Sequence, residues 1–368
     1  MHAVTLASLR TPAVLIDRAV ALRNIHRMQD AATAAGIRLR PHTKTHKSPV
    51  VARWQVDAGA SGICCAKLGE AEVFADAGFT DIRLPYPIHP SNADRVVALL
   101  DRTRLSFIVD HLGVAQQWSE AMVRAGREVD ILVKIDVGFH RCGIDPDTRD
   151  TLPTIKSIAA LPGLRFRGLL SHAGQTYHAS SEDELRVIAD AEARTLDDLA
   201  ERCKKSGLPV EDVSAGATPP ARYSLRQKGF TEFRPGNYVY FDRTQVALGA
   251  ATSDDCALTV LATVVTKPAP NRLILDSGSK TLTNDGARGF TPAPGYGTII
   301  GHDNLVIERL SEEHATVKVQ GTTSLQPGDR VRIIPNHSCV VSNLVDAAWL
   351  VDGDDVSPLP IAARGRIS

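Results

Sequence analysis

The sequence predicts an α/β protein in which a (β/α)₈ barrel of the TIM type precedes a mostly antiparallel β domain. Up to about residue 245, β-branched apolar runs alternate strictly with segments of helical periodicity, as is typical of a parallel sheet. Eight such units favour a closed barrel over an open doubly wound sheet. Beyond that point the runs become short, β-rich and punctuated by glycine and proline. The 368 residues therefore divide into a barrel over 1–245 and a β domain over 246–368.

Each barrel unit is placed by its apolar run and the turn residues around it. A helix over 18–34 precedes the first strand, and Asp17 is placed as its N-cap. The extended stretch TPAVLIDR at 11–18 is a candidate strand of the β domain. The expected barrel strands cover 37–40, 62–66, 82–86, 105–110, 130–136, 166–172, 210–216 and 233–241. The expected helices between them cover 46–58, 69–77, 90–102, 112–126, 147–160, 182–206 and 218–228.

The composition is that of a soluble globular protein. Apolar residues make up 43% of the chain, and 42 acidic side chains balance 42 basic ones. A chain without net charge is a poor partner for nucleic acid or anionic membranes. No apolar stretch is long enough to span a membrane and the N-terminus lacks the apolar core of a secretory signal, so we expect a cytoplasmic protein. The six cysteines follow no framework spacing and are expected to be free thiols.

Polar and glycine-rich groups follow five of the eight expected strands. Functional groups of a barrel cluster at the C-terminal ends of its strands, so these five segments are expected at one rim. Each segment alone has an ordinary structural explanation, such as a helix cap, a core histidine or a turn. Five of them together indicate a functional site. The segments are RPHTKTH, KIDVGFHRCG, LLSHAGQTYH, VSAGATPP and RPGNYVYFD.

The segment VSAGATPP is the best candidate for an anion site. Ser214, Gly216 and Thr218 lie at an expected junction between strand and helix, where hydroxyls and free amide groups bind a phosphate. The segment lacks a Walker or dinucleotide fingerprint, which favours a single phosphate over a nucleotide. A phosphate site opposite a lysine at another strand end, such as Lys44 in RPHTKTH, is what a pyridoxal phosphate enzyme requires.

A second kind of site is indicated by IIPNHSCVV in the β domain. If this segment is a strand, His337 and Cys339 present an imidazole and a thiol on the same face. Histidine and cysteine together favour zinc. Taken alone, the pair is more simply explained as a surface histidine beside a core cysteine.

These segments together resemble one known family over nearly the whole chain. The motifs of the D-serine dehydratase and D-threonine aldolase family are matched by TPAVLIDRAVALRNIHRM, RPHTKTHKS, GICCAKLGEAEVFADAG, KIDVGFHRCG, SHAGQTY, RPGNYVYFD and PNHSC. Members of this family are fold-type III pyridoxal phosphate enzymes related to alanine racemase. The resemblance implies an alanine-racemase-like barrel, a C-terminal β domain, one pyridoxal phosphate per subunit and a homodimer.

The resemblance also implies roles for individual residues. Lys44 matches the lysine that holds the cofactor, and His172 matches the residue that packs on the pyridine ring. Arg141 and Arg234 both match arginines directed at the ring or the substrate, and we favour Arg141 for the pyridine nitrogen. Tyr177 is expected to reach the substrate carboxylate or the ring. The residues that match the phosphate site are Ser214, Gly216, Thr218, Gly236, Asn237 and Tyr238.

The family binds a divalent metal at the motif that His337 and Cys339 match, and zinc is expected, with manganese or magnesium as alternatives. Two protein ligands leave coordination positions for the 3-hydroxyl of a substrate. The family's dehydratases tend to carry cysteine and its aldolases aspartate at the position of Cys339. The resemblance therefore implies a lyase that converts a D-3-hydroxy amino acid, such as D-serine, into a 2-oxo acid and ammonia.

Three alternatives remain open. An aldolase would cleave the same substrates to glycine and an aldehyde. A racemase would need a second acid/base residue, for which Tyr296 is the candidate, and a pyridoxal phosphate carrier would catalyse nothing. The loops 86–92 and 284–290 are expected to shape the pocket for the substrate side chain. Arg288 is either a partner for a distal carboxylate or a solvent-facing charge.

Overall fold

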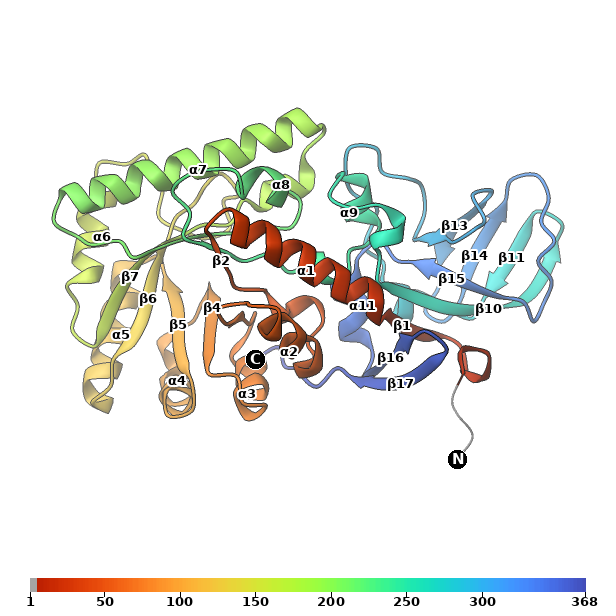
Figure 1. Cartoon of the computed structure of the whole chain (residues 1–368), viewed down its shortest axis with the longest axis horizontal. Helices are drawn as coiled ribbons and strands as arrows, with labels where there is room; N and C mark the ends of the chain where they lie inside the picture. Colours follow the sequence, from red (N-terminus) through yellow and green to blue (C-terminus); the bar gives the residue numbers. More distant parts are fainter. Residues whose placement is uncertain (1–4) are drawn as a thin grey trace.

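A computed structural model describes residues 5–368 of the chain, and residues 1–4 lie outside the described part. The described residues form two sheets, one of eight strands and one of nine (Figure 1). All strands of the eight-stranded sheet pair in parallel, whereas pairing in the nine-stranded sheet is antiparallel except between β1 and β16. The predicted architecture, a parallel barrel followed by a mostly antiparallel β domain, is confirmed.

The barrel sheet has the order β2-β9-β8-β7-β6-β5-β4-β3. A parallel bridge between His42 and Cys64 joins its two ends, so the segment behind the first strand also closes the barrel. Seven of the eight strands lie where the apolar runs predicted them, and the eighth overlaps its predicted run only at Phe233. Their bounds are β2 (Arg38–Leu39), β3 (Ile63–Cys64), β4 (Asp81–Pro87), β5 (Arg104–Val109), β6 (Val129–Lys134), β7 (Leu164–Leu170), β8 (Asp212–Ala215) and β9 (Glu232–Phe233).

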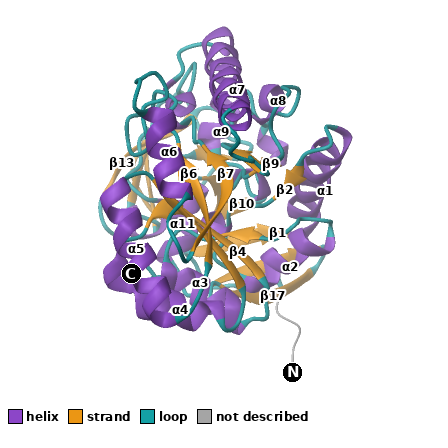
Figure 2. Ribbon diagram, turned by 90° about the vertical axis from the view of Figure 1, so that its left-hand side faces the viewer, coloured by secondary structure: helices purple, strands orange, loops and turns teal. Residues whose placement is uncertain are grey.

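Helices cover the outside of the barrel (Figure 2). The side chain of Asp17 accepts a hydrogen bond from the amide of Val20 at 3.0 Å, which confirms it as the N-cap of α1. In Figure 1, α1 runs along the junction of the two domains. The helices are α1 (Arg18–Ala34), α2 (Pro49–Asp57), α3 (Leu68–Asp76), α4 (Ala93–Leu100), α5 (Leu112–Ala125), α6 (Thr151–Ala159), α7 (Glu182–Lys205) and α8 (Ala221–Ser224).

Two expected elements are much shorter than predicted. The strand expected over 233–241 ends at Phe233, because Pro235 has no N–H for the ladder and the chain then forms the 3₁₀ turn η5 (Asn237–Val239). The helix expected over 218–228 is reduced to α8, since two consecutive prolines before Ala221 disfavour helical geometry in the residues that precede them. Both regions become irregular loops at the rim of the barrel.

The second sheet includes the N-terminal strand. β1 (Ala13–Asp17) pairs antiparallel with β10 and parallel with β16, so both ends of the chain contribute to this sheet. The remaining strands are β10 (Leu258–Ala269), β11 (Arg272–Leu275), β12 (Thr298–Ile299), β13 (Leu305–Leu310), β14 (Ala315–Val319), β15 (Arg330–Ile334), β16 (Ala347–Asp352) and β17 (Asp355–Pro360). Short helices between them are α9 (Arg243–Ala247), α10 (Ser279–Leu282) and α11 (Ser338–Leu344).

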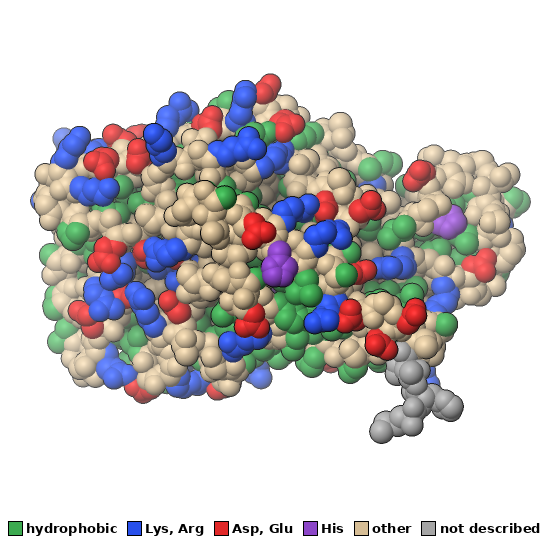
Figure 3. Space-filling view, viewed as in Figure 1, with side chains coloured by type: hydrophobic (Ala, Val, Ile, Leu, Met, Phe, Trp, Pro, Cys, Tyr) green, Lys and Arg blue, Asp and Glu red, His purple; other side chains and the backbone are tan. Residues whose placement is uncertain are grey.

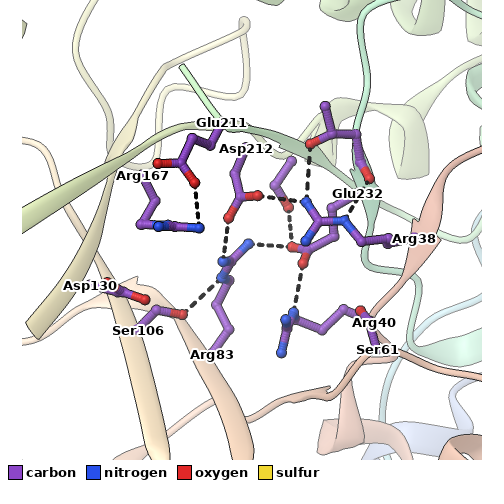
Figure 4. Close-up of polar contacts among 12 residues, drawn as sticks. Arg38, Arg40, Ser61, Arg83, Ser106, Asp130, Arg167, Glu211, Asp212 and Glu232 are labelled. Atoms are coloured by element: carbon purple, nitrogen blue, oxygen red, sulfur yellow. Dashed lines mark hydrogen bonds and ion pairs between the residues drawn. The ribbon is translucent and has the colours of Figure 1, made fainter. Parts of the chain in front are cut away.

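Part of the barrel interior is ionic (Figure 4). The guanidinium of Arg83 on β4 contacts both Glu232 on β9 and, at 2.8 Å, Asp212 on β8. Arg40, just beyond β2, reaches the second oxygen of Glu232 at 2.7 Å. These four side chains are at most 4% exposed. Although burial raises it, the charges of Arg83 and Arg40 hold the pKa of Glu232 well below its usual range.

On the face of the molecule shown in Figure 3, acidic and basic side chains are interspersed, and neither charge dominates. Among residues 5–368, no helix has the length and apolar character needed to cross a membrane. All six cysteines are free thiols, as their spacing predicted.

Candidate active site

A cavity of about 310 Å³ opens at the C-terminal ends of the barrel strands and is closed on one side by the β domain. Of the thirteen residues expected in the site, Ser214 and Tyr238 do not line it. The cavity therefore brings together all five predicted rim segments of the barrel and the segment of the β domain that contains His337 and Cys339. The expected residues that do line it are Lys44, Arg141, His172, Tyr177, Gly216, Thr218, Arg234, Gly236, Asn237, His337 and Cys339.

Lys44 is presented by a short, well-anchored turn. It lies in the 3₁₀ turn η2 (Thr43–Thr45), and the hydroxyl of Thr43 donates to the carbonyl of Cys64 at 2.9 Å. The ring of His42 accepts from the amide of Lys44 at 3.3 Å. Desolvation by the cavity walls lowers the pKa of Lys44, Arg141 and Arg234 lower it further, and the thiolate of Cys339 opposes them. The amine is thus more readily deprotonated than an ordinary lysine.

The other basic residues of the segment RPHTKTHKS have different surroundings. His46 is buried away from the cavity, with its Nε2 3.2 Å from the Gln55 side chain and its Nδ1 accepting from the amide of Ser48. Burial lowers the pKa of His46 to about 4, so it is neutral at physiological pH. Lys47 is buried and forms an ion pair with Glu70 at 2.9 Å. Only Lys44 and His42 therefore face the reaction space.

A cradle of free amide groups lies beside Lys44. Within residues 5–368, the backbone N–H groups of five residues donate to no backbone acceptor although all five line the cavity. A Cβ on Gly216 would lie 2.7 Å from the backbone of Arg234, and one on Gly236 would lie 3.2 Å from His42, so side chains would fill this space. Several converging amides and no side chain fit a phosphate. The five residues are Gly216, Ala217, Thr218, Gly236 and Asn237.

Two side chains assigned to the phosphate are committed elsewhere. Ser214 points into the barrel, where its hydroxyl donates to Glu232 and accepts from Nε of Arg234, both at 2.7 Å. The hydroxyl of Tyr238 accepts from Gln55 at 3.0 Å in the core. The expectation that these two side chains bind a phosphate is corrected, because both hydroxyls bond to buried protein groups and neither side chain lines the cavity.

The two arginines differ in how they are held. Arg234 is buried, and its Nε and Nη2 bond to Ser214 and to the carbonyl of Ser171, so its position is fixed. Arg141 is exposed at the cavity and its guanidinium lies 5.3 Å from the ring of Phe139. A fixed guanidinium suits a contact with the cofactor, whereas a mobile one suits a substrate that enters and leaves. This difference favours Arg234, against our expectation from the sequence, for the contact with the ring.

His172 and Tyr177 both line the cavity in neutral forms. Nδ1 of His172 lies 2.7 Å from the carbonyl of Gly216, to which it donates, so Nε2 is left as an acceptor. Burial and the positive charges of Lys44 and Lys134 hold the pKa of His172 well below its usual range. Burial also raises the pKa of Tyr177, which keeps the phenol protonated.

The segment with His337 and Cys339 is not the strand that we expected. β15 ends at Ile334, His337 is the N-cap of α11, and Cys339 lies in the first turn of that helix. The helix begins here because Asp242 accepts from the amide of Ser338 at 3.0 Å and satisfies the helix start. Both side chains still face the cavity.

His337 and Cys339 behave as a charged pair in the absence of a metal. Burial opposes the charge on the imidazole, but the thiolate of Cys339 and the carboxylates of Asp242 and Asp285 raise the pKa of His337 to about 10. Burial raises the pKa of the thiol, yet His337 and Lys44 outweigh it and lower the pKa of Cys339. A thiolate beside an imidazole is the donor set that a soft divalent cation prefers.

Asp285 is the functional residue that the sequence analysis missed. Its Oδ2 lies 2.5 Å from Nδ1 of His337, although the two residues are 52 positions apart. A carboxylate on one nitrogen directs the other, Nε2, toward a metal. The loop 284–290 was expected near the substrate, and Asp285, Gly286 and Arg288 do line the cavity. The loop 86–92 does not line it.

No cluster of three or more histidine, cysteine or carboxylate groups suited to a metal occurs within residues 5–368. His337 and Cys339 could supply two ligands to a metal, since both face the cavity and the Cys339 sulfur lies 3.2 Å from the Thr45 hydroxyl. A metal held there retains open coordination positions, which fits a catalytic ion rather than a structural one.

Comparison with known proteins agrees with this architecture. Residues 16–244 match the family described as "Alanine racemase, N-terminal domain", and residues 257–351 match "Putative serine dehydratase domain". The chain is 36% identical over 350 residues to D-threo-3-hydroxyaspartate dehydratase of Delftia sp. (strain HT23), covering 91% of this chain and 92% of the relative. It is 33% identical over 365 residues to D-threonine aldolase of Arthrobacter sp., covering 98% and 94%.

Solved structures give the same result. A metal-free cysteine-to-alanine mutant of D-threo-3-hydroxyaspartate dehydratase has a TM-score of 0.92 at 33% identity and covers 97% of this chain and 98% of that chain. The first domain alone accounts for more than half of the residues. With this barrel, this second domain and these relatives, the chain belongs to the D-serine dehydratase and D-threonine aldolase family.

Proposed function

We propose that the protein is a pyridoxal phosphate- and divalent metal-dependent lyase that dehydrates D-3-hydroxy amino acids to a 2-oxo acid and ammonia. One observation carries the proposal. Lys44, the cradle of five free amides and the pair His337 and Cys339 all face one cavity of about 310 Å³. When bound, pyridoxal phosphate would supply an electron sink for charge at Cα, and a divalent cation would act as a Lewis acid on the 3-hydroxyl.

The residues of the chain supply the remaining functions. Lys44 would attach the cofactor and then accept the α-proton at Nζ, a role that its lowered pKa favours. The free amides would hold the phosphate, and neutral His172 would lie against the ring with Nδ1 fixed on Gly216. Arg141 would meet the substrate carboxylate, since its guanidinium contacts no carboxylate of residues 5–368 within 4.0 Å.

The choice of dehydration rests on Cys339, which matches the dehydratases of the family. The second candidate is aldolase cleavage to glycine and an aldehyde, and the similarity to the Arthrobacter D-threonine aldolase over 98% of the chain favours it. A racemase is less well supported, because it would have no use for the metal pair of His337 and Cys339 that faces the cavity. A carrier function would leave the metal pair and its domain without a role.

The test is the identity of the product. Purified enzyme with pyridoxal phosphate and zinc is incubated with D-serine and D-threonine, and oxo acid, ammonia, glycine and acetaldehyde are measured together. We expect an oxo acid with one equivalent of ammonia from each substrate. The variant Cys339→Ala should stop turnover while the absorbance of the bound cofactor persists. Glycine and acetaldehyde from D-threonine would instead establish the aldolase, and unchanged turnover by the variant would remove the metal assignment.

A second prediction concerns Asp285. Because its carboxylate orients the ring of His337, Asp285→Ala should weaken zinc binding about 10- to 100-fold. Competition against a chromogenic chelator measures this affinity without reference to turnover. Asp303→Ala removes an exposed carboxylate of the same domain and serves as the matched control, for which no change is expected. Equal affinities in both variants would show that Asp285 does not support the metal site.

Assembly and location complete the proposal. Family membership supports a homodimer, which sedimentation of the purified enzyme would test. Six free thiols are usual for a reducing compartment and support a cytoplasmic location. Family membership likewise supports the D configuration of the substrate, and the imidazole and thiolate of His337 and Cys339 favour zinc over manganese or magnesium.

A further inference from the structure

We propose that Arg288 binds a second, distal carboxylate, so that the preferred substrate is a D-3-hydroxy amino acid with two carboxylates. The inference rests on the proposed function, because it concerns the same cavity. Three arginines line that cavity. Arg234 is held by Ser214 and Ser171, but Arg141 and Arg288 have no carboxylate of residues 5–368 within 4.0 Å. Two free guanidinium groups in one cavity match two carboxylates.

The position of Arg288 relates it to one part of the substrate. It follows Asp285 by three residues on the same loop, and Asp285 holds His337 at 2.5 Å. The proposed metal pair would bind the 3-hydroxyl on Cβ, and the loop with Arg288 lines the same cavity as that pair, within reach of the remaining substituent on Cβ. Arg141 approaches instead from the barrel, on the loop beyond β6. The two guanidinium groups therefore reach the same cavity from different domains, and we assign one to each end of a dicarboxylate.

The loop presents Arg288 from two fixed points. The carbonyl of Asp285 accepts from Asn336 at 3.0 Å, and the amide of Phe290 donates to the carbonyl of Ala247 at 3.1 Å. Gly289 has a φ of +119° and a Cβ there would lie 2.5 Å from the Cβ of Ala247, so the loop sits close against α9. Arg288 is thus held at the cavity although its side chain is exposed.

The electrostatic surroundings also direct this guanidinium toward the cavity. Arg288 borders a second, smaller hollow of about 220 Å³ on the other side of the loop. Arg243 lines that hollow, and no acidic side chain of residues 5–368 does. The larger cavity contains the carboxylates of Asp285 and Asp242, but both are already bonded to other groups. An anionic substrate would supply the negative charge that could pair with Arg288.

The kinetic test compares two substrates that differ at Cβ only in the distal group. For the holoenzyme, Arg288→Met should lower kcat/KM for D-threo-3-hydroxyaspartate roughly tenfold or more, mainly through a higher KM. The same variant should change kcat/KM for D-threonine less than about twofold. Arg309→Met removes an exposed, unpaired arginine of β13 and should change neither substrate. An equal fall for both substrates in Arg288→Met, or no fall for the dicarboxylate, would overturn the inference and leave the lyase proposal intact.

A binding test does not depend on turnover. D-Aspartate and D-alanine lack the 3-hydroxyl and cannot be dehydrated, so their affinity for the holoenzyme is measured by calorimetry. Arg288→Met should weaken the binding of D-aspartate roughly tenfold and leave the affinity for D-alanine unchanged. If the wild type turned over no 3-hydroxy amino acid, the proposed function would fail and this comparison alone would decide the inference. Equal effects on both ligands would then refute it.

Discussion

Replacing Lys44 with alanine is expected to lower turnover on the order of 10⁴-fold or more. Lys44 is the only lysine that lines the cavity within residues 5–368, and burial together with Arg141 and Arg234 lowers its pKa. The same amine is expected both to attach the cofactor and to accept the α-proton, so its loss removes two functions at once. Oxo-acid formation in the steady state gives the size of the effect.

A second readout separates loss of attachment from loss of folding. Borohydride reduction of the wild type followed by proteolysis should leave the cofactor on the peptide that contains Lys44, and the variant should carry none. Lys67→Ala is the matched control, because Lys67 lies just beyond the adjacent strand β3, 5.0 Å from the ring of Tyr86, and does not line the cavity. Retention of both cofactor and activity in Lys44→Ala would remove the central assignment.

Replacing Glu232 with alanine is expected to lower the free energy of unfolding by about 3–5 kcal/mol, because it removes the carboxylate that two buried guanidinium groups share and leaves each with only its second carboxylate, Asp212 or Asp81. Glu232 contacts both Arg83 and Arg40 inside the barrel (Figure 4). The matched control is Glu211→Ala. Glu211 pairs with Arg167 at 2.6 Å but is 54% exposed, and such surface pairs contribute about 0–1 kcal/mol. Urea unfolding midpoints of the two variants measure the difference.

The pH dependence gives an independent check on Glu232. Its pKa in the folded protein lies below the unfolded value of about 4.3. The stabilisation is therefore fully present above that value and is lost as the pH falls through the folded pKa. The isosteric variant Glu232→Gln keeps one of the two acceptor oxygens and should lose less stability than Glu232→Ala, with a weaker decline on acidification than the wild type. If Glu232→Ala were no less stable than Glu211→Ala, the buried network would not stabilise the barrel.

The sequence by itself determined the order of the elements and the general location of the site. The strict alternation of apolar, β-branched runs with helical segments predicts that all strands run in parallel. Parallel strands bring their C-terminal ends to one rim of the barrel. Residues that directly follow a strand, such as Lys44, His172 and Gly216, were therefore placed correctly without knowledge of any contact. The free amides beside Gly216 follow from the same argument, since a glycine-rich loop leaves its backbone unpaired.

Only the tertiary structure decided which side chains meet. The direction of Ser214 depends on Arg234 and Glu232, and the role of Asp285 depends on His337, 52 positions away. Local periodicity contains no information about such partners, because they are distant in the sequence and only tertiary packing brings them together. The change from an expected strand to the helix start at Ser338 has the same origin: Asp242 supplies the cap from a distant loop. Sequence patterns identify where polar groups gather, and packing determines which of them remain free to bind a ligand.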